Sequence, residues 1–292
     1  MMLLISLAFA KQLDFDREKA GEDERYHVRW TDAGGDKQEV RFTLASDDVK
    51  RDLDRPLHFP ARDAGEAMAA AANRAADDVK GVKFSAKASK SGAVRMSARG
   101  TASGVQKAMK KAKAAEKAAL ANFMDDHRYI ELYGGMIDDH ARIAVGEASR
   151  IRPLAEALAE GEKGERAYVR RALSFVQSIP YEKRKGGKDA GFRKPLAVVA
   201  RNRADCDGKS TLFLSLVRAA YPKLDAAVVY VPGHAFAGVA LDPKPGERTF
   251  RRDGVRYVVV EPVGPYVAPI GKASGVAGWH LFWGSAQVHA LK

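Results

Sequence analysis

The sequence is poor in cysteine and in long apolar runs, and both shortages limit the protein classes that fit it. Among its 292 residues, Cys206 is the only cysteine. A single cysteine excludes an internal disulfide and every zinc site built from several cysteines. The free thiol suits either a reducing compartment or a nucleophile in an oxidising one, so it does not decide the compartment. No stretch approaches the roughly 20 apolar residues that a membrane-spanning helix requires.

Composition indicates a globular protein with an excess of positive charge. Hydrophobic residues make up 46% of the chain and charged residues 29%, which is enough to bury a core, and the length favours two units. The net charge is +12 and the pI is about 9.7. The lysines of residues 107–117 alternate with alanine in a predicted helix, without a nucleic-acid-binding module or an aromatic platform. We therefore interpret them as a solvated face, which disfavours nucleic acid and leaves anionic envelope polymers or acidic proteins as partners.

The first ten residues are typical of the end of a secretory signal. They are apolar and finish Ala8-Phe9-Ala10, an A-x-A pattern before Lys11. This pattern predicts export to the periplasm or beyond. A buried first strand in a cytoplasmic protein is the alternative interpretation.

Periodicity and turn residues predict an α+β protein. After the signal-like residues 1–10, we expect an N-terminal α+β domain at 11–100, a helical connector at 101–160 and a second domain at 161–292. The elements predicted before the second domain are strands at 26–30, 38–44, 82–88 and 93–98 and helices at 61–80, 103–129 and 136–159, the last broken at Pro153. The Gly-rich and charged residues 160–164 are the clearest linker.

The second domain is predicted to combine helices with an antiparallel sheet. Its predicted elements are helices at 165–177 and from 206 to 221, and strands at 226–231, 234–241, 249–252 and 255–260. The last two strands flank Asp253-Gly254, a pair suited to a tight hairpin turn. Residues 183–194, rich in Gly and Lys, are either a loop bordering a cleft or a plain surface loop.

Cys206 stands where a nucleophile is favoured. Apolar residues recur at helical spacing from Leu212 to Ala220, which places Cys206 in or just before the first helical turn. Unpaired backbone N–H groups and the positive end of the helix dipole favour a thiolate there. The neighbouring Asp205 and Asp207 would oppose ionisation, so we expect both to face away, one of them capping the helix.

A histidine and a carboxylate follow the cysteine in an order that suits a triad. His234 heads a strand after the Pro232-Gly233 turn, and Glu261 ends the strand at 255–260. If these strands are antiparallel neighbours, the end of one lies beside the start of the other. His234 would then serve as the base for Cys206, with Glu261 orienting the imidazole.

An attacked carbonyl also needs N–H donors for its oxyanion. The backbone amide of Cys206 is the natural first donor. Asn202, Gln177 and Trp279 are candidates for the second donor or for the cleft. The proposed chemistry carries its own nucleophile and base, so it implies neither a metal nor an organic cofactor.

The residues resemble the transglutaminase-like superfamily of papain-type thiol enzymes, and its bacterial cysteine-peptidase branch in particular. The matching segments are residues 175–181 (FVQSIPY), 203–210 (RADCDGKS), 233–236 (GHAF) and 260–262 (VEP), with Ile270-Gly271 behind them. The resemblance covers roughly the last 130 residues and implies a papain/transglutaminase-like core, a helix packed on an antiparallel sheet. It assigns Cys206 as nucleophile, His234 as base and Glu261 as orienting acid. Ala204 stands where the family usually has Gly, and Glu261 where it more often has Asp.

The resemblance implies thiol-dependent acyl transfer on a protein or peptide substrate. The sulfur attacks a carbonyl carbon, and water or an amine resolves the thioester. We expect hydrolysis of a peptide or amide bond in the cell envelope. The alternatives are protein cross-linking by a transglutaminase and a catalytically inactive interaction scaffold on the same fold.

Overall fold

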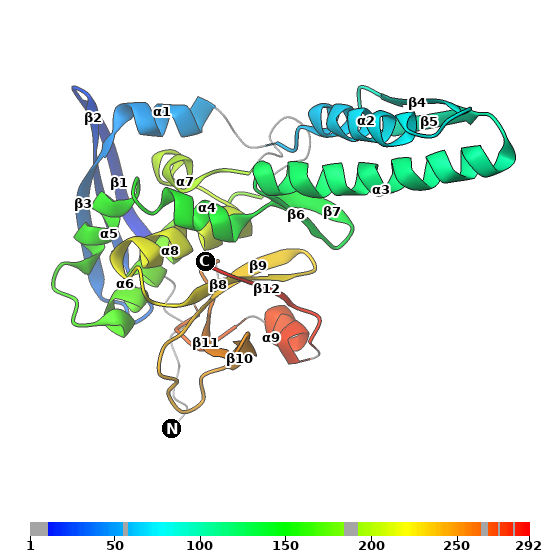
Figure 1. Cartoon of the computed structure of the whole chain (residues 1–292). Helices are drawn as coiled ribbons and strands as arrows, with labels where there is room; N and C mark the ends of the chain where they lie inside the picture. The colour runs from blue at the N-terminus through cyan, green and yellow to red at the C-terminus, as the bar shows by residue number, and fades with distance from the viewer. Residues whose placement is uncertain (1–10, 55–57, 184–191, 264–267, 274, 283) are drawn as a thin grey trace. The chain divides into compact units, whose positions relative to one another are not determined.

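A computed structural model of the chain describes residues 11–54, 58–183, 192–263, 268–273, 275–282 and 284–292. The signal-like residues 1–10 and most of the expected loop at 183–194 lie outside these ranges. The chain divides into two compact units (Figure 1). Unit 1 combines residues 1–57 with 140–292, and unit 2 consists of residues 58–139. Helices and antiparallel strands are mixed in both units, which confirms the α+β class.

The predicted domain boundaries differ from this division. The first and second hairpins of the expected 11–100 domain fall in different units, and the expected connector is split at residue 140. The reason is the inner face of the first sheet, formed by β1 (Lys11–Ala20), β2 (Asp23–Thr31) and β3 (Lys37–Ala45). Trp30 on this face is fully buried, packs edge-on against Phe175 and donates a hydrogen bond from Nε1 to Ser174 Oγ at 3.0 Å.

Helices fill the space between the two sheets of unit 1 (Figure 1). They are α1 (Ser46–Asp54), α4 (His140–Glu147), α5 (Arg152–Ala159), α6 (Glu165–Ser178), α7 (Pro195–Arg201) and α8 (Cys206–Ala220). Helices α5 and α6 contact the first sheet, and α8 contacts β8 and β9 of the second. Pro153 breaks the chain between α4 and α5 as predicted, because it occupies the start of α5. Residues 160–164 join α5 to α6 within unit 1, so they do not link two domains.

The second sheet of unit 1 has the order β10-β11-β9-β8-β12 and is antiparallel throughout. Its strands are β8 (Ala226–Val231), β9 (His234–Val239), β10 (Thr249–Arg252), β11 (Val255–Val260) and β12 (Gln287–Ala290), with α9 (Gly275–Phe282) before β12. Every residue of β8 is buried. Asp253 and Gly254 both have positive φ, as the hairpin prediction required.

Unit 2 packs a hairpin on two alanine-rich helices. It contains α2 (Ala61–Asp77), β4 (Lys83–Ala88), β5 (Val94–Arg99), α3 (Ala102–Asp126), β6 (Tyr129–Leu132) and β7 (Gly135–Asp138). The predicted helix at 136–159 is therefore wrong at its start, where residues 135–138 pair with β6 instead. The core of unit 2 includes small side chains such as Ala72, Ala108 and Ala112, which let the helices and the hairpin approach closely. Among the described residues, no helix has the length and apolar character needed to cross a bilayer.

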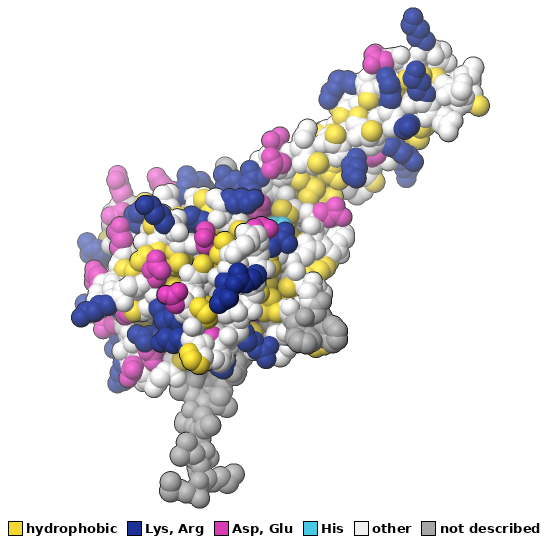
Figure 2. Space-filling model, turned by 60° about the horizontal axis from the view of Figure 1, so that its bottom comes forward, with side chains coloured by type: hydrophobic (Ala, Val, Ile, Leu, Met, Phe, Trp, Pro, Cys, Tyr) yellow, Lys and Arg dark blue, Asp and Glu magenta, His cyan; other side chains and the backbone are white. Residues whose placement is uncertain are grey.

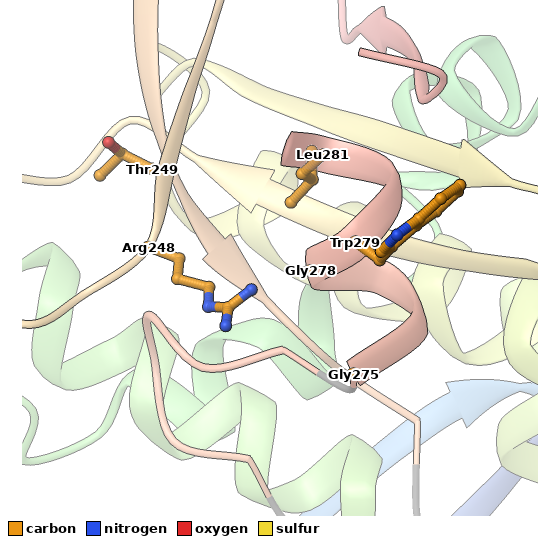
Figure 3. Close-up of a pocket in the computed structure, with 6 residues that line it drawn as sticks. All are labelled: Arg248, Thr249, Gly275, Gly278, Trp279 and Leu281. Atoms are coloured by element: carbon orange, nitrogen blue, oxygen red, sulfur yellow. The ribbon is translucent and has the colours of Figure 1, made fainter. Parts of the chain in front are cut away.

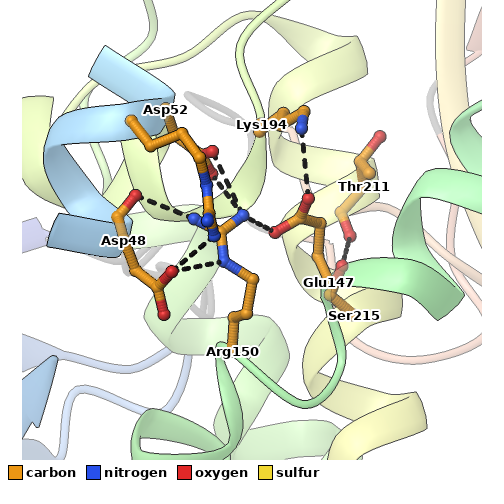
Figure 4. A network of polar contacts seen from close by, with 8 residues as sticks. Asp48, Asp52, Glu147, Arg150, Lys194, Thr211 and Ser215 are labelled. Atoms are coloured by element: carbon orange, nitrogen blue, oxygen red, sulfur yellow. Dashed lines mark hydrogen bonds and ion pairs between the residues drawn. The ribbon is translucent and has the colours of Figure 1, made fainter. Parts of the chain in front are cut away.

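A buried ionic network joins α1 to the central helices of unit 1 (Figure 4). Arg150 donates to both carboxylate oxygens of Asp52, at 3.1 and 3.0 Å, to the Asp48 carbonyl at 2.8 Å, and to Glu147. Lys194 adds a second cation at 3.4 Å from Glu147. Burial and repulsion from Glu147 raise the pKa of Asp52, whereas Arg150 opposes both effects. The guanidinium thus keeps two close carboxylates compatible with burial.

We expect Arg150→Met to destabilise the protein by about 3–5 kcal/mol, because it leaves two buried carboxylates without their shared cation. Urea unfolding at neutral pH measures this change. Arg152→Met, at an exposed position two residues further on, is the matched control and should change the unfolding free energy by less than about 0.5 kcal/mol. Equal effects of the two substitutions would contradict the role given to Arg150.

Candidate active site

The start of α8 is shaped by a side-chain cap. Asp205 is the N-cap residue, and its Oδ1 accepts a hydrogen bond from the Gly208 N–H at 3.0 Å. This confirms that one of the two aspartates caps the helix. Cys206 is the first helical residue, so its own backbone N–H has no partner within the helix. Just before the cap, Ala204 is fixed by backbone hydrogen bonds with Pro180 and Glu182.

The Cys206 side chain is held against the beginning of β9. Interaction with the backbone of Ala235 lowers the pKa of the thiol. One turn along α8, Ser210 Oγ donates to the Ala235 carbonyl at 3.0 Å. The start of α8 is therefore close to Ala235, the residue that follows His234.

His234 and Glu261 are in direct contact. Strands β9 and β11 are antiparallel neighbours, with Val260 opposite Ala237, as the sequence analysis supposed. Continuing this register places Glu261 and His234 on the same sheet face in a diagonal arrangement, which a long side chain can span. His234 Nε2 lies 2.8 Å from Glu261 Oε2. Glutamate, with one methylene more than aspartate, suits this diagonal reach.

The contact also orients the imidazole. An ionised carboxylate only accepts hydrogen bonds, so Nε2 carries the proton and Nδ1 presents its lone pair. Among the described residues, Nδ1 has no hydrogen-bond partner. The Glu261 side chain is only 3% exposed and also accepts from the Val263 N–H at 3.3 Å, while the His234 side chain is 18% exposed. The carboxylate is therefore fixed beneath a ring that solvent can reach.

His234 and Glu261 are thus in direct contact. Cys206 is linked to them through Ala235, the residue that follows His234. Within the described ranges there is no hydrogen bond between the Cys206 sulfur and the His234 ring. The thiol contacts Asp207 Oδ1 at 3.7 Å instead. The expectation that Asp207 faces away from the thiol was therefore wrong.

The Cys206 thiol is neutral at physiological pH. Burial raises its pKa to about 12, and the negative charges of Asp207 and Asp205 add to this effect. The expected thiolate at a helix start is not favoured here, because desolvation and two carboxylates outweigh the N–H groups that stabilise the anion. Chemistry at this sulfur requires a base.

The side-chain amides of two of the three candidates for the oxyanion or the cleft form hydrogen bonds within the protein. Gln177 Nε2 donates to the carbonyls of Glu261 and Ala268, both at 2.8 Å, so this amide supports the chain at Glu261 and is not available to an oxyanion. Asn202 has a left-handed backbone at the end of α7 and exchanges two side-chain hydrogen bonds with Gln12. In both cases the side-chain amide is held by neighbours distant in sequence.

The third candidate, Trp279, lies on α9 in a pocket of about 570 Å³ (Figure 3). Trp279 is 58% exposed. The described residues lining this pocket are Arg248, Thr249, Gly275, Gly278, Trp279 and Leu281. None of the catalytic candidates is among them, so this pocket does not connect Trp279 with the sulfur.

The sequence favours Lys209 as an ordinary solvated charge, and the structure corrects this. Lys209 is fully buried, one turn beyond Cys206 on α8, and its Nζ donates to the Gln177 carbonyl at 3.3 Å. Burial lowers its pKa to about 7, and attraction to Glu261 partly opposes that shift. Its position three residues after Cys206, on the helix face that carries apolar side chains, was a signal that the lysine would be buried.

Nothing in the described part of the chain groups three or more His, Cys, Asp or Glu side chains in a way that could hold a metal ion. Searches of protein-family models, curated proteins and solved structures found no match to this chain. The family resemblance therefore rests on its short sequence segments, and the functional argument rests on the geometry described above.

We expect Asp207→Asn to lower the Cys206 thiol pKa by about one unit, because it removes the nearest negative charge. Below the pKa, the rate of alkylation by iodoacetamide follows the thiolate fraction, so the rate at pH 8 should rise about tenfold. Asp225→Asn, an exposed position on the same unit, is the control. An unchanged rate in Asp207→Asn would show that this carboxylate does not act on the sulfur.

We expect Lys209→Met to stabilise the protein by about 1–4 kcal/mol at pH 7, because a buried amine is replaced by a side chain of similar length that needs no solvation. The pKa of Lys209 is lowered on folding, so between pH 7 and its unfolded value the unfolded state binds more protons and wild-type stability rises with pH. The advantage of the variant should therefore shrink from pH 7 to 9 in urea titrations. A pH-independent difference, like that expected for the exposed control Lys223→Met, would contradict the lowered pKa.

Proposed function

We propose that this protein catalyses thiol-dependent acyl transfer at a peptide or amide bond, with hydrolysis as the overall reaction. The observation that carries the proposal is the 2.8 Å contact between His234 Nε2 and Glu261 Oε2, formed next to Ala235, whose backbone interacts with the Cys206 thiol. An imidazole oriented by a buried carboxylate next to a helix-start thiol is the arrangement that nucleophilic catalysis by cysteine requires.

The arrangement of elements supports the same proposal. Helix α8 presents Cys206 at its first residue and packs on β8 and β9 of the antiparallel sheet. His234 and Glu261 come from the adjacent strands β9 and β11. A helix on an antiparallel sheet, with residues in the order Cys, His, acid, resembles a papain/transglutaminase-like core.

The first half of the reaction forms an acyl-enzyme. As the sulfur attacks the carbonyl carbon, His234 Nδ1 takes the thiol proton, and Glu261 stabilises the resulting imidazolium. The carbonyl oxygen becomes an oxyanion beside the unpaired Cys206 N–H. When the intermediate collapses, the C–N bond breaks, His234 returns the proton to the leaving amine, and a thioester remains on Cys206.

The second half releases the acid. Water attacks the thioester carbon while His234 takes one of its protons, and the C–S bond breaks as that proton returns to the sulfur. The products are a carboxylic acid and the free thiol. Because the resting thiol is neutral, the rate depends on proton transfer to His234 and not on a stored thiolate.

The same raised pKa favours a second candidate function, an interaction scaffold that keeps the fold without turnover. Two aspartates near a nucleophilic sulfur oppose the anion that forms during attack. The scaffold hypothesis predicts intact folding and no amide cleavage by the wild-type chain.

Hydrolysis of a library of N-acetyl-peptide p-nitroanilides tests the proposal. Wild-type protein should release p-nitroaniline, and Cys206→Ala should abolish the release with an unchanged unfolding midpoint, since a residue in the first helical turn adds little to the core. Ser215→Ala, deeper in the same helix, is the control and should keep the activity. Equal cleavage by Cys206→Ala would eliminate the nucleophile assignment, and no cleavage by the wild type would favour the scaffold.

Replacement of Glu261 tests the orienting acid in the same assay. We expect Glu261→Gln to lower kcat roughly 10²–10⁴-fold, because the amide does not stabilise an imidazolium. Iodoacetamide should still alkylate Cys206, which separates loss of orientation from loss of the thiol. Glu156→Gln, an exposed carboxylate on α5, is the matched control. A rate unaffected by Glu261→Gln would mean that Glu261 has no part in the reaction.

A further inference from the structure

Most of the net positive charge of the chain lies in one part of unit 2. Residues 80–117 contain eleven Lys and Arg side chains and a single acid, Glu116, so these 38 residues carry +10 of the +12 of the whole sequence. All eleven cations are exposed. Figure 2 shows lysine and arginine side chains dominating the charged surface of this unit at its end. The excess positive charge is therefore local to residues 80–117.

Like charges face each other on the outer side of the β4–β5 hairpin. Lys83 is directly opposite Arg99, and Lys87 is directly opposite Arg95. Between these two pairs lies Ser85 opposite Ser97, on the same face. The other face, which includes Phe84 and Met96, packs on the alanine core. Directly opposed like charges destabilise a strand pair, so this hairpin carries an energetic cost that its own fold does not offset.

The first hairpin of the chain shows the opposite pattern. On β1 and β2, acidic and basic residues are placed across from one another in three pairs: Asp14 with Arg29, Glu18 with Arg25, and Lys19 with Glu24. The β1–β2 hairpin thus carries complementary cross-strand charges, whereas the β4–β5 hairpin carries two repelling pairs on one face. Such a face is suited to an external anionic partner.

Helix α3 continues the pattern. Lys107 and Lys111, and Lys113 and Lys117, are spaced four residues apart, where like charges repel on a helix surface. Within unit 2, the 3.7 Å contact of Lys111 with Asp78 is the one ion pair formed by the cations of residues 80–117. The remaining cations are therefore free to bind anions.

We propose that the cations of residues 80–117 bind the backbone of a phosphodiester polymer without reading its sequence. A polymer of regularly spaced negative charges neutralises the opposed pairs, and the Ser85 and Ser97 hydroxyls can donate to phosphate oxygens between them. No large apolar side chain is exposed between residues 80 and 117, so this surface lacks both the apolar core of a protein interface and the side chains that enter a bilayer. The absence of an aromatic platform excludes base stacking.

The test measures binding of the full-length protein to a fluorescent mixed-sequence 24-base-pair DNA duplex between about 50 and 200 mM salt. Each phosphate contact contributes about −0.9 to the slope of log K against log salt. The variant in which Lys83, Lys87, Arg95 and Arg99 are all replaced by Gln should therefore lower the steepness by about 3–4 and bind at least tenfold more weakly at 50 mM salt. Its unfolding midpoint should stay equal or rise, because repulsion is removed.

The matched control replaces Lys37, Lys50, Arg251 and Arg256 by Gln, the same number of exposed Lys and Arg residues in unit 1. It even includes a cross-strand pair of like charges, Arg251 with Arg256. The control should keep wild-type affinity and slope. Equal loss in the control, an unchanged slope in the hairpin variant, or binding to vesicles with anionic lipid as tight as to the duplex would each overturn the proposal.

Discussion

The hydrogen bond between His234 and Glu261 is the interaction on which the candidate site depends. It requires β9 and β11 to be neighbours in a fixed register, because a shift of one residue would turn either side chain to the opposite sheet face. Gln177 reinforces that register from α6 by binding the carbonyls of Glu261 and Ala268. The buried helices between the two sheets therefore position a carboxylate that solvent barely reaches.

The environment of the sulfur is less favourable to ionisation than its helix position alone indicates. The first turn of α8 offers unpaired N–H groups, but Asp205 and Asp207 bring two negative charges to the same turn. Asp205 stabilises α8 as its N-cap, so the negative charge of Asp205 near the sulfur accompanies a structural role. In the proposed reaction, Cys206 is a neutral nucleophile and His234 is an oriented base, so proton transfer between them is the decisive step.

Much of the fold could be predicted because local signals agreed with the tertiary structure. The helix from Cys206, the strands that carry His234 and Glu261, and the turn at Asp253-Gly254 all have clear periodicity or turn chemistry. The predicted domain boundaries differ from the compact units because the partner of Trp30 is 144 residues away, and no local pattern reveals which surface will cover a sheet. The same limit applies to Asn202 and Gln177, whose amides are satisfied by distant groups.

The β1–β2 and β4–β5 hairpins differ in their cross-strand charges, and strand register is the property that reveals the difference. A count of lysines indicated only a basic protein, and the alternation with alanine in α3 indicated a solvated face. The pairing of β4 with β5 shows that basic residues repel each other across the strands, which composition cannot show.

The pH dependence of Cys206 alkylation by iodoacetamide, compared between wild-type protein and His234→Ala, tests the central claim most directly. The wild-type protein should be alkylated faster than His234→Ala near neutral pH, because the imidazole accepts the thiol proton. Superimposable profiles for the two proteins would contradict the account.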